Sequence, residues 1–196
     1  VVKISLPSIN VIYRDVFNMK FLYTVIHEWL VEEGWTDLLG GDDHQFLERL
    51  FLERRVGVKE IRIWWRSQKS PDNPSNPDVG KSSFYKYRLN IYMNVINMTD
   101  TEVVHEGKKL KAQRGEITIF ILPMLDFDPD KGLEKHWLVK YFFRYFRTRV
   151  LKKQLEARRK ELIRDTYRLQ GMIKKYLEER LFIPEFEVFH EKFEET

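Results

Sequence analysis

Residues 84–97, FYKYRLNIYMNVIN, decide the class of the fold. Apolar side chains occupy every second position from Tyr85 to Val95, and mostly polar side chains stand between them. A period of two residues places alternate side chains on opposite faces of a β-strand. The stretch therefore predicts a strand with one buried face and one polar face.

Segments on both sides of this strand also favour β-structure. Residues 59–69, KEIRIWWRSQK, alternate in the same way, and residues 116–125 form a nearly all-apolar run that predicts a central strand. The others are a hairpin over 101–113 that turns at 106–108 and an edge strand over 2–12 that Pro7 interrupts. Together they predict an antiparallel sheet of four or five strands.

Helical spacing predicts that helices pack against this sheet. One helix, capped by Asp15, is expected to run to Glu33 and to end at Gly34. A second is expected from Asp42 or Asp43 through Arg54, with its apolar face made of Phe46, Leu47, Leu50 and Phe51. An aromatic-rich helix is expected over 133–150, and a long basic helix follows it to about residue 181.

The chain length of 196 residues fits one domain of the α+β class. We assign residues 1–150 to an α+β core. Residues 151–196 then form an extension of the same domain, made of the long basic helix and an acidic aromatic tail.

Charge is segregated along the chain. The net charge is +4, but residues 144–181 hold thirteen basic and five acidic side chains, so this segment is +8 and the remainder is −4. Such a density of cations is typical of surfaces that bind phosphate backbones or another acidic partner, although a solvated helix face gives the same pattern.

Two sets of residues are candidates for binding nucleic acid or another anion. On the predicted sheet, basic and aromatic side chains share the polar face, a combination that suits single-stranded nucleic acid: Arg62, Trp64, Arg66, Lys86, Arg88 and Tyr92. On the long helix the candidates are Arg158, Arg159, Lys160, Arg164, Arg168, Lys174 and Lys175.

The long helix also carries a narrow apolar stripe at spacings of three, four and seven residues. Such a stripe on a charged helix predicts a partner, in the same chain or in another. The residues expected to make this partner or oligomer contact are Leu155, Leu162, Leu169, Ile173 and Leu177, with Phe186, Phe189 and Phe193 of the tail.

Catalytic signatures are scarce. Asp126, Asp128 and Asp130 form the one candidate for a divalent metal site, but Lys131 and Trp137 stand where an EF-hand needs glycine and glutamate. A turn that caps the following helix is the favoured interpretation. The five histidines are scattered, phosphate-binding loops and a nucleophile elbow are missing from the sequence, and there is no cysteine. We predict no cofactor.

These patterns favour a non-enzymatic binding or assembly protein that contacts nucleic acid or another acidic surface. The alternatives are a self-assembling structural subunit, of filament, capsid or shell type, and a metal-dependent enzyme that uses the three aspartates. The sequence predicts no transmembrane segment. The lack of cysteine favours the cytoplasm and leaves an extracellular or virion location open.

Overall fold

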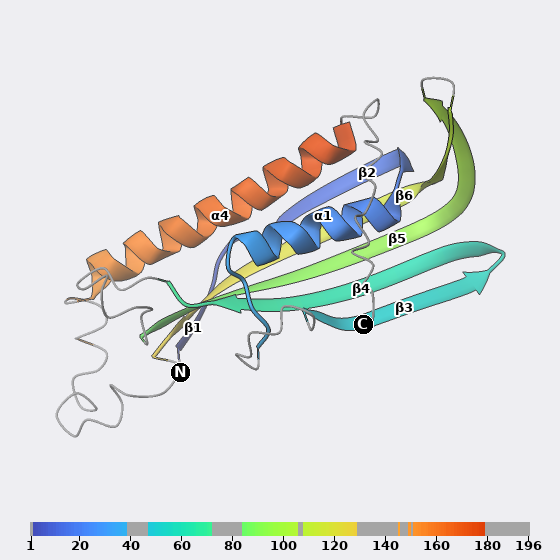
Figure 1. The fold of residues 1–196 in the computed structure, drawn as a ribbon. Coiled ribbons are helices and arrows are strands. Elements are labelled where there is room, and N and C mark those ends of the chain that lie inside the picture. Colours follow the sequence, from blue (N-terminus) through green and yellow to red (C-terminus); the bar gives the residue numbers. More distant parts are fainter. Residues whose placement is uncertain are drawn as a thin grey trace, which may run out of the picture.

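The computed structural model describes residues 2–38, 47–71, 84–105, 108–128 and 151–178, with the single positions 145 and 149. It confirms the α+β class and the antiparallel sheet, in which α1 and α4 lie across one face (Figure 1). The elements are β1 (Val2–Ser5), β2 (Ile9–Phe17), α1 (Met19–Glu32), β3 (Glu48–Val56), β4 (Val58–Lys69), β5 (Tyr85–His105), β6 (Lys108–Phe127) and α4 (Lys152–Glu178).

The sheet has six strands rather than the predicted four or five. Its order is β1-β6-β5-β4-β3, and β2 also pairs with β6. Because β1 pairs near the end of β6 and β2 pairs further back along it, the two short strands together form one edge. Pro7 lies between them, so the predicted break in the edge strand is correct and accounts for the additional strand.

The first helix begins later than predicted. Asp15 belongs to β2, opposite Gly115, and Asn18 caps the helix by accepting a hydrogen bond from the backbone N–H of Phe21 at 3.0 Å. The β-pairing of residues 9–17 with β6 prevails over the capping preference of Asp15. Gly34 follows the end of α1 with a φ of +74°, a conformation that glycine adopts without strain.

The predicted helix that ends at Arg54 is wrong within the described residues. From Glu48 onward the chain forms β3, which pairs with β4 through a turn at Gly57, where φ is +78°. The apolar spacing of Leu47, Leu50 and Phe51 suits a helix as well as a strand, and pairing with β4 decides between them. The earlier part of that prediction, residues 42–46, lies outside the described residues.

Strands β5 and β6 form one long hairpin whose far end is the predicted hairpin over 101–113. The position of its turn, residues 106–107, is outside the described part. A β-bulge lies between Ile96 and Thr99, where Asn97 adopts a φ of +53°. Gly115 lies opposite this bulge, and an added Cβ there would be only 3.0 Å from the carbonyl oxygen of Ile96.

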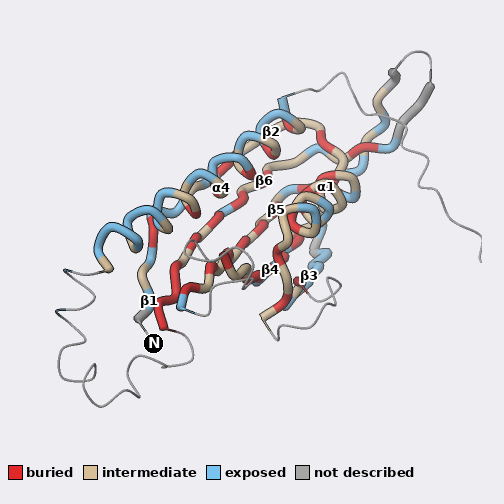
Figure 2. The backbone as a smooth tube through the Cα atoms, turned by 60° about the vertical axis from the view of Figure 1, so that its left-hand side comes forward, coloured by how far each residue is buried: buried red, intermediate tan, exposed pale blue. Residues whose placement is uncertain are grey.

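The core lies between the sheet and the two helices, as the buried segments in Figure 2 show. The stripe of α4 belongs to it: Leu162, Leu169 and Ile173 are fully buried, Leu177 is buried and Leu155 packs against the cluster. The stripe therefore packs on its own sheet. The sequence left the partner of the stripe open, in the same chain or in another, and in this structure these residues pack within the same chain.

Several expectations fall outside the described residues. These are the helix over 133–150, apart from positions 145 and 149, and the tail with Phe186, Phe189 and Phe193. Among the described helices, none is long and apolar enough to cross a bilayer.

A candidate binding face on the open side of the sheet

The sheet has a second face, opposite the one that α1 and α4 cover. One row of side chains crosses five strands on this face, because the pairing register places Leu50, Trp64, Tyr92, Phe120 and Asn10 directly opposite one another. Direct neighbours on adjacent strands have Cβ atoms about 5 Å apart. Three aromatic residues therefore occupy neighbouring positions across β4, β5 and β6. We call this row the aromatic row.

The aromatic row is accessible. Trp64 is 40% exposed and Phe120 is 41% exposed, whereas neighbours that point to the covered face, such as Ile63 and Ile121, are fully buried. The rings of Trp64 and Tyr92 make an edge-on contact, with centroids 5.7 Å apart and planes at 76°. Exposed aromatic side chains that adjoin one another are typical of a binding surface.

Two arginines flank the aromatic row on the same strand. Arg62 and Arg66 precede and follow Trp64 by two residues, so all three side chains point to the open face and both guanidinium groups are exposed. Arg62 lies in the row Leu52, Arg62, Asn94, Thr118 and Ile12, in which Leu52 and Ile12 are also exposed. The two arginines thus lie next to the aromatic residues on the same face of the sheet, as the sequence predicted.

Arg88 is different, because it is engaged within the chain. Its Nε lies 2.6 Å from Oδ2 of Asp126, whose side chain is fully buried. The register places Lys86 directly across from Asp126 on the neighbouring strand. Arg88 therefore neutralises a buried carboxylate, and we assign it a role in stability and not in binding. Lys86 remains a candidate for contact with an anion.

The aspartate cluster does not assemble within the described residues. Asp126 is paired with Arg88, and Asp128 is a buried turn residue with a φ of +51° whose backbone N–H donates to the carbonyl of Phe84 at 2.9 Å. Asp130 is outside the described part. Across the described ranges, no group of three or more histidine or acidic residues could hold a metal ion.

Two of the basic candidates on α4 bind acidic groups of the same chain. Arg158 lies 2.6 Å from Oε2 of Glu161, which also accepts the hydroxyl proton of Tyr87 at 2.7 Å. Burial, followed by this hydrogen bond, raises the pKa of Tyr87. Arg168 holds Glu33 with two hydrogen bonds, of 2.5 and 3.1 Å, and so ties α4 to the end of α1.

The remaining candidates on α4 are exposed: Arg159, Lys160, Arg164, Lys174 and Lys175. Because α4 packs with its stripe on the covered face of the sheet, these residues lie on the helix side of the sheet, and Lys174 among them lines a pocket next to β2. The sequence grouped the basic helix with the basic aromatic strands. The structure separates them into two surfaces on opposite sides of the sheet, so one short ligand cannot span both.

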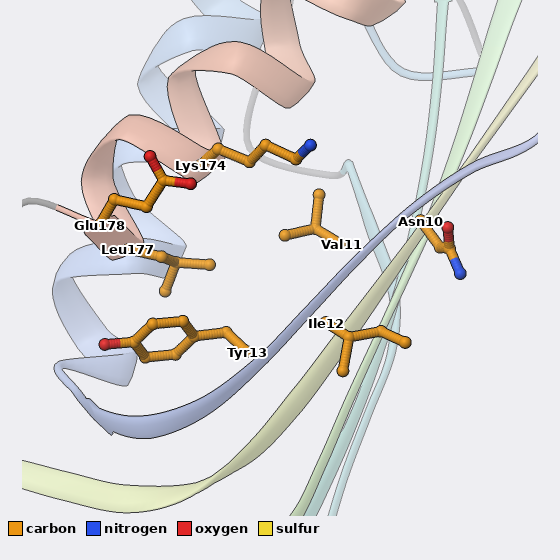
Figure 3. Close-up of a pocket in the computed structure, with 7 residues that line it drawn as sticks. All are labelled: Asn10, Val11, Ile12, Tyr13, Lys174, Leu177 and Glu178. Atoms are coloured by element: carbon orange, nitrogen blue, oxygen red, sulfur yellow. The ribbon is translucent and has the colours of Figure 1, made fainter.

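A pocket of about 300 Å³ lies between β2 and the end of α4 (Figure 3). Its lining contains one cation, Lys174, and one anion, Glu178, together with apolar side chains such as Val11 and Leu177. The formal charges of the lining cancel, so the pocket does not extend the cationic surface of α4.

Comparison of the chain with protein-family models, with curated proteins and with solved structures gave no match. The site is therefore argued from its own geometry. Sequence reasoning does not find Phe120, because it lies in a nearly all-apolar run, and it does not find Leu50 and Leu52, because their spacing also suits a helix. Alternation within 116–125 would have placed Phe120 on the polar face if the register had been known.

Proposed function

We propose that this protein is a non-enzymatic binding protein whose open sheet face binds single-stranded nucleic acid. The observation that carries the proposal is the aromatic row, with Trp64, Tyr92 and Phe120 on three adjacent strands and Arg62 and Arg66 beside it. Unpaired bases stack on aromatic rings, and arginine contacts the phosphates between them.

The geometry favours a single strand over a duplex. The rings belong to a sheet surface that is flanked by other side chains, so they can reach bases only where those bases are unstacked and unpaired. Phosphates would contact Arg62 and Arg66 on β4, and Lys86 on β5 offers a third cation on the same face. The exposed cations of α4 form a separate, weaker candidate surface.

The test is a binding titration by fluorescence anisotropy, with labelled oligothymidine, oligouridine and a DNA duplex as probes. Trp64→Ala and Phe120→Ala each remove one stacking ring, so affinity for the single strands should fall by about 5- to 100-fold. Arg62→Ala with Arg66→Ala should lower the slope of log affinity against log salt by about 1.4, because two phosphate contacts are lost.

The matched control is Tyr167→Ala, which removes an exposed ring from α4 on the other side of the sheet. It should leave binding unchanged. A second control, Arg159→Ala with Lys160→Ala, tests the helix surface. If that variant loses binding while Trp64→Ala does not, the helix surface binds the nucleic acid and the proposal is wrong. Absence of binding by the wild-type protein also rejects it.

Self-assembly as a structural subunit is the second candidate function. The observation that favours it is that two apolar residues, Ile12 and Leu52, are exposed on the open face. They lie at the two ends of the row that contains Arg62. Light scattering of nuclease-treated protein separates the candidates. Large assemblies that persist at high salt favour the structural subunit, and nuclease-sensitive material on small particles favours nucleic-acid binding.

A further inference from the structure

Strand β3 forms one edge of the sheet. It pairs with β4 on its inner side, and none of the described residues forms a backbone hydrogen bond with its outer side. Residues 51–55 are all exposed, and they include two large apolar side chains, Phe51 at 49% and Leu52 at 48%. An open strand edge with exposed apolar side chains is a template for pairing with another strand.

The sequence of β3 is complementary to itself. Residues 48–54 read ERLFLER, in which three apolar residues stand between charged residues arranged as Glu-Arg on both sides. If two copies run antiparallel with Phe51 opposite Phe51, then Leu50 faces Leu52 and Arg49 faces Glu53. In the same register Glu48 faces Arg54. Apolar groups thus meet apolar groups, and opposite charges meet at both ends.

We propose that a second copy of this chain binds at β3, with the two strands antiparallel and Phe51 on the two-fold axis. This symmetry joins the two sheets edge to edge and keeps the same face of each copy on the same side. Phe51 of each chain lies on the face that carries the helices, because it pairs with Ile63, and Leu50 and Leu52 lie on the open face. Both faces therefore contribute an apolar contact.

The charge pattern selects this register over its neighbour. With Leu52 on the axis instead, Phe51 would face Glu53, Leu50 would face Arg54, and Arg49 would face Arg55. Like charges directly opposite each other are destabilising, and so is a carboxylate against a phenyl ring. Only the register centred on Phe51 places each of the three apolar residues from Leu50 to Leu52 opposite another apolar residue.

Local structure limits the length of the contact. The pairing with β4 shifts between Glu48 and Leu50, and Arg49 forms an ion pair with Asp37 of its own chain. Regular pairing therefore begins at Leu50, and the apolar triplet from Leu50 to Leu52 is the centre of the interface. A contact of this size is small, so we expect a dimer that dissociates on dilution.

The absence of cysteine from the natural chain allows a direct test of the register. In Phe51→Cys the two introduced thiols would face each other across the axis, within reach of a disulfide. In the matched control Glu53→Cys, each thiol lies opposite Arg49, four residues from the thiol of the other copy, so the bond cannot form without moving the strands. Both residues are exposed, and because Glu53 also pairs with Arg55 and Lys59, circular dichroism shows whether each variant is folded.

The measurement is the rate of covalent dimer formation under mild oxidation, followed on non-reducing gels. We expect Phe51→Cys to cross-link at least about tenfold faster than Glu53→Cys. Equal rates would indicate random collision, and faster reaction of Glu53→Cys would indicate another register. Either result overturns the proposal, and so does the absence of cross-linking in both.

A second measurement keeps the proposal testable if Phe51→Cys does not fold. A mixture of Leu50→Cys and Leu52→Cys chains should form a covalent heterodimer, because these residues face each other between copies. Light scattering of the wild-type protein over a dilution series should give twice the chain mass at high concentration and the chain mass at low concentration. A constant monomer mass at every concentration would overturn the proposal.

Discussion

The two faces of the sheet arise from the same alternating strands but have different environments. On the covered face, Ile63, Ile91 and Ile119 are fully buried beneath α1 and α4. On the open face, Trp64 and Phe120 keep about two fifths of their surface in contact with solvent. A pattern of alternate residues thus fixes which side chains share a face. It does not fix which face the helices cover, and that choice decides where a ligand can bind.

The polar groups of the two faces differ as well. Three tyrosine hydroxyls at the covered face form hydrogen bonds: Tyr87 donates to Glu161, Tyr23 to Glu48 and Tyr176 to the carbonyl of Asn18. On the open face, Arg62 and Arg66 are exposed. These hydrogen bonds stabilise the covered face, whereas the two exposed arginines of the open face are available for the ligand contact that we propose.

The largest expected effect on the free energy of unfolding comes from removing a buried side chain of α4 from the covered face. Leu169→Ala removes a fully buried side chain from the stripe that packs on the sheet, so the free energy of unfolding should fall by about 2 to 5 kcal/mol. Urea denaturation measures this loss.

The matched control for that variant is Tyr167→Ala, two residues earlier on the exposed side of the same helix. Its effect should stay within about 0.5 kcal/mol. A Leu169→Ala protein as stable as the wild type would show that the stripe is not packed on its own sheet and would return it to the role of a contact between chains.

The second largest effect is expected at alkaline pH, where the tyrosines packed at the covered face should lower the free energy of unfolding. Burial, with hydrogen bonding to Glu48 second, raises the pKa of Tyr23 to about 12, and burial raises that of Tyr176 to about 12. The unfolded chain loses these protons near pH 10, as free tyrosine does. Below that pH the stabilisation is complete, and the free energy of unfolding should fall as the pH rises from about 10 to about 12.

Urea denaturation over this pH range checks the alkaline prediction. Tyr23→Phe and Tyr176→Phe remove one titrating group each, so each variant should show a shallower fall than the wild type. If the pH dependence is the same in the variants, other groups cause it and the raised tyrosine pKa values do not contribute.

The smallest effect on stability is expected on the open face. Phe120→Ala should lower the free energy of unfolding by about 1 kcal/mol or less, because the ring is partly solvated in the folded protein. The same variant should lose much of the affinity for single strands. A large loss of stability would mean that the ring is needed for folding. Phe120 would then stabilise the protein as the buried residues of the covered face do, contrary to the difference between the two faces described above.

Much of the sheet follows from sequence because alternation is a local property. The period of residues 59–69 and 84–97 correctly assigned two strands and the shared face of Arg62, Trp64, Arg66 and Tyr92. Prediction from alternation fails where the spacing of apolar residues suits both a helix and a strand. The segment from Leu47 to Arg54 suits a helix, and only its pairing with a distant strand makes it β3.

The candidate site was predictable only in part for the same reason. Basic residues of α4 looked equivalent in sequence, but Arg158 and Arg168 bind Glu161 and Glu33 through contacts that depend on the packing of α4. Arg88 is likewise engaged by Asp126, on the strand next to its own. The number of basic residues in a segment does not show which of them pair with carboxylates of the same chain and which are available to a ligand.

The break at Pro7 limits how far sheets of this protein can grow. A chain with two good strand edges adds copies at both ends and forms a fibre, whereas a chain with one such edge stops at a pair. Proline has no N–H to offer an incoming strand, and the side chain of Gln170 already donates to the carbonyl of Asn10 at 3.4 Å on the same edge. In the proposed dimer both β3 edges are occupied, so further growth would have to use the interrupted edge of β1 and β2, which offers no continuous strand to a third copy.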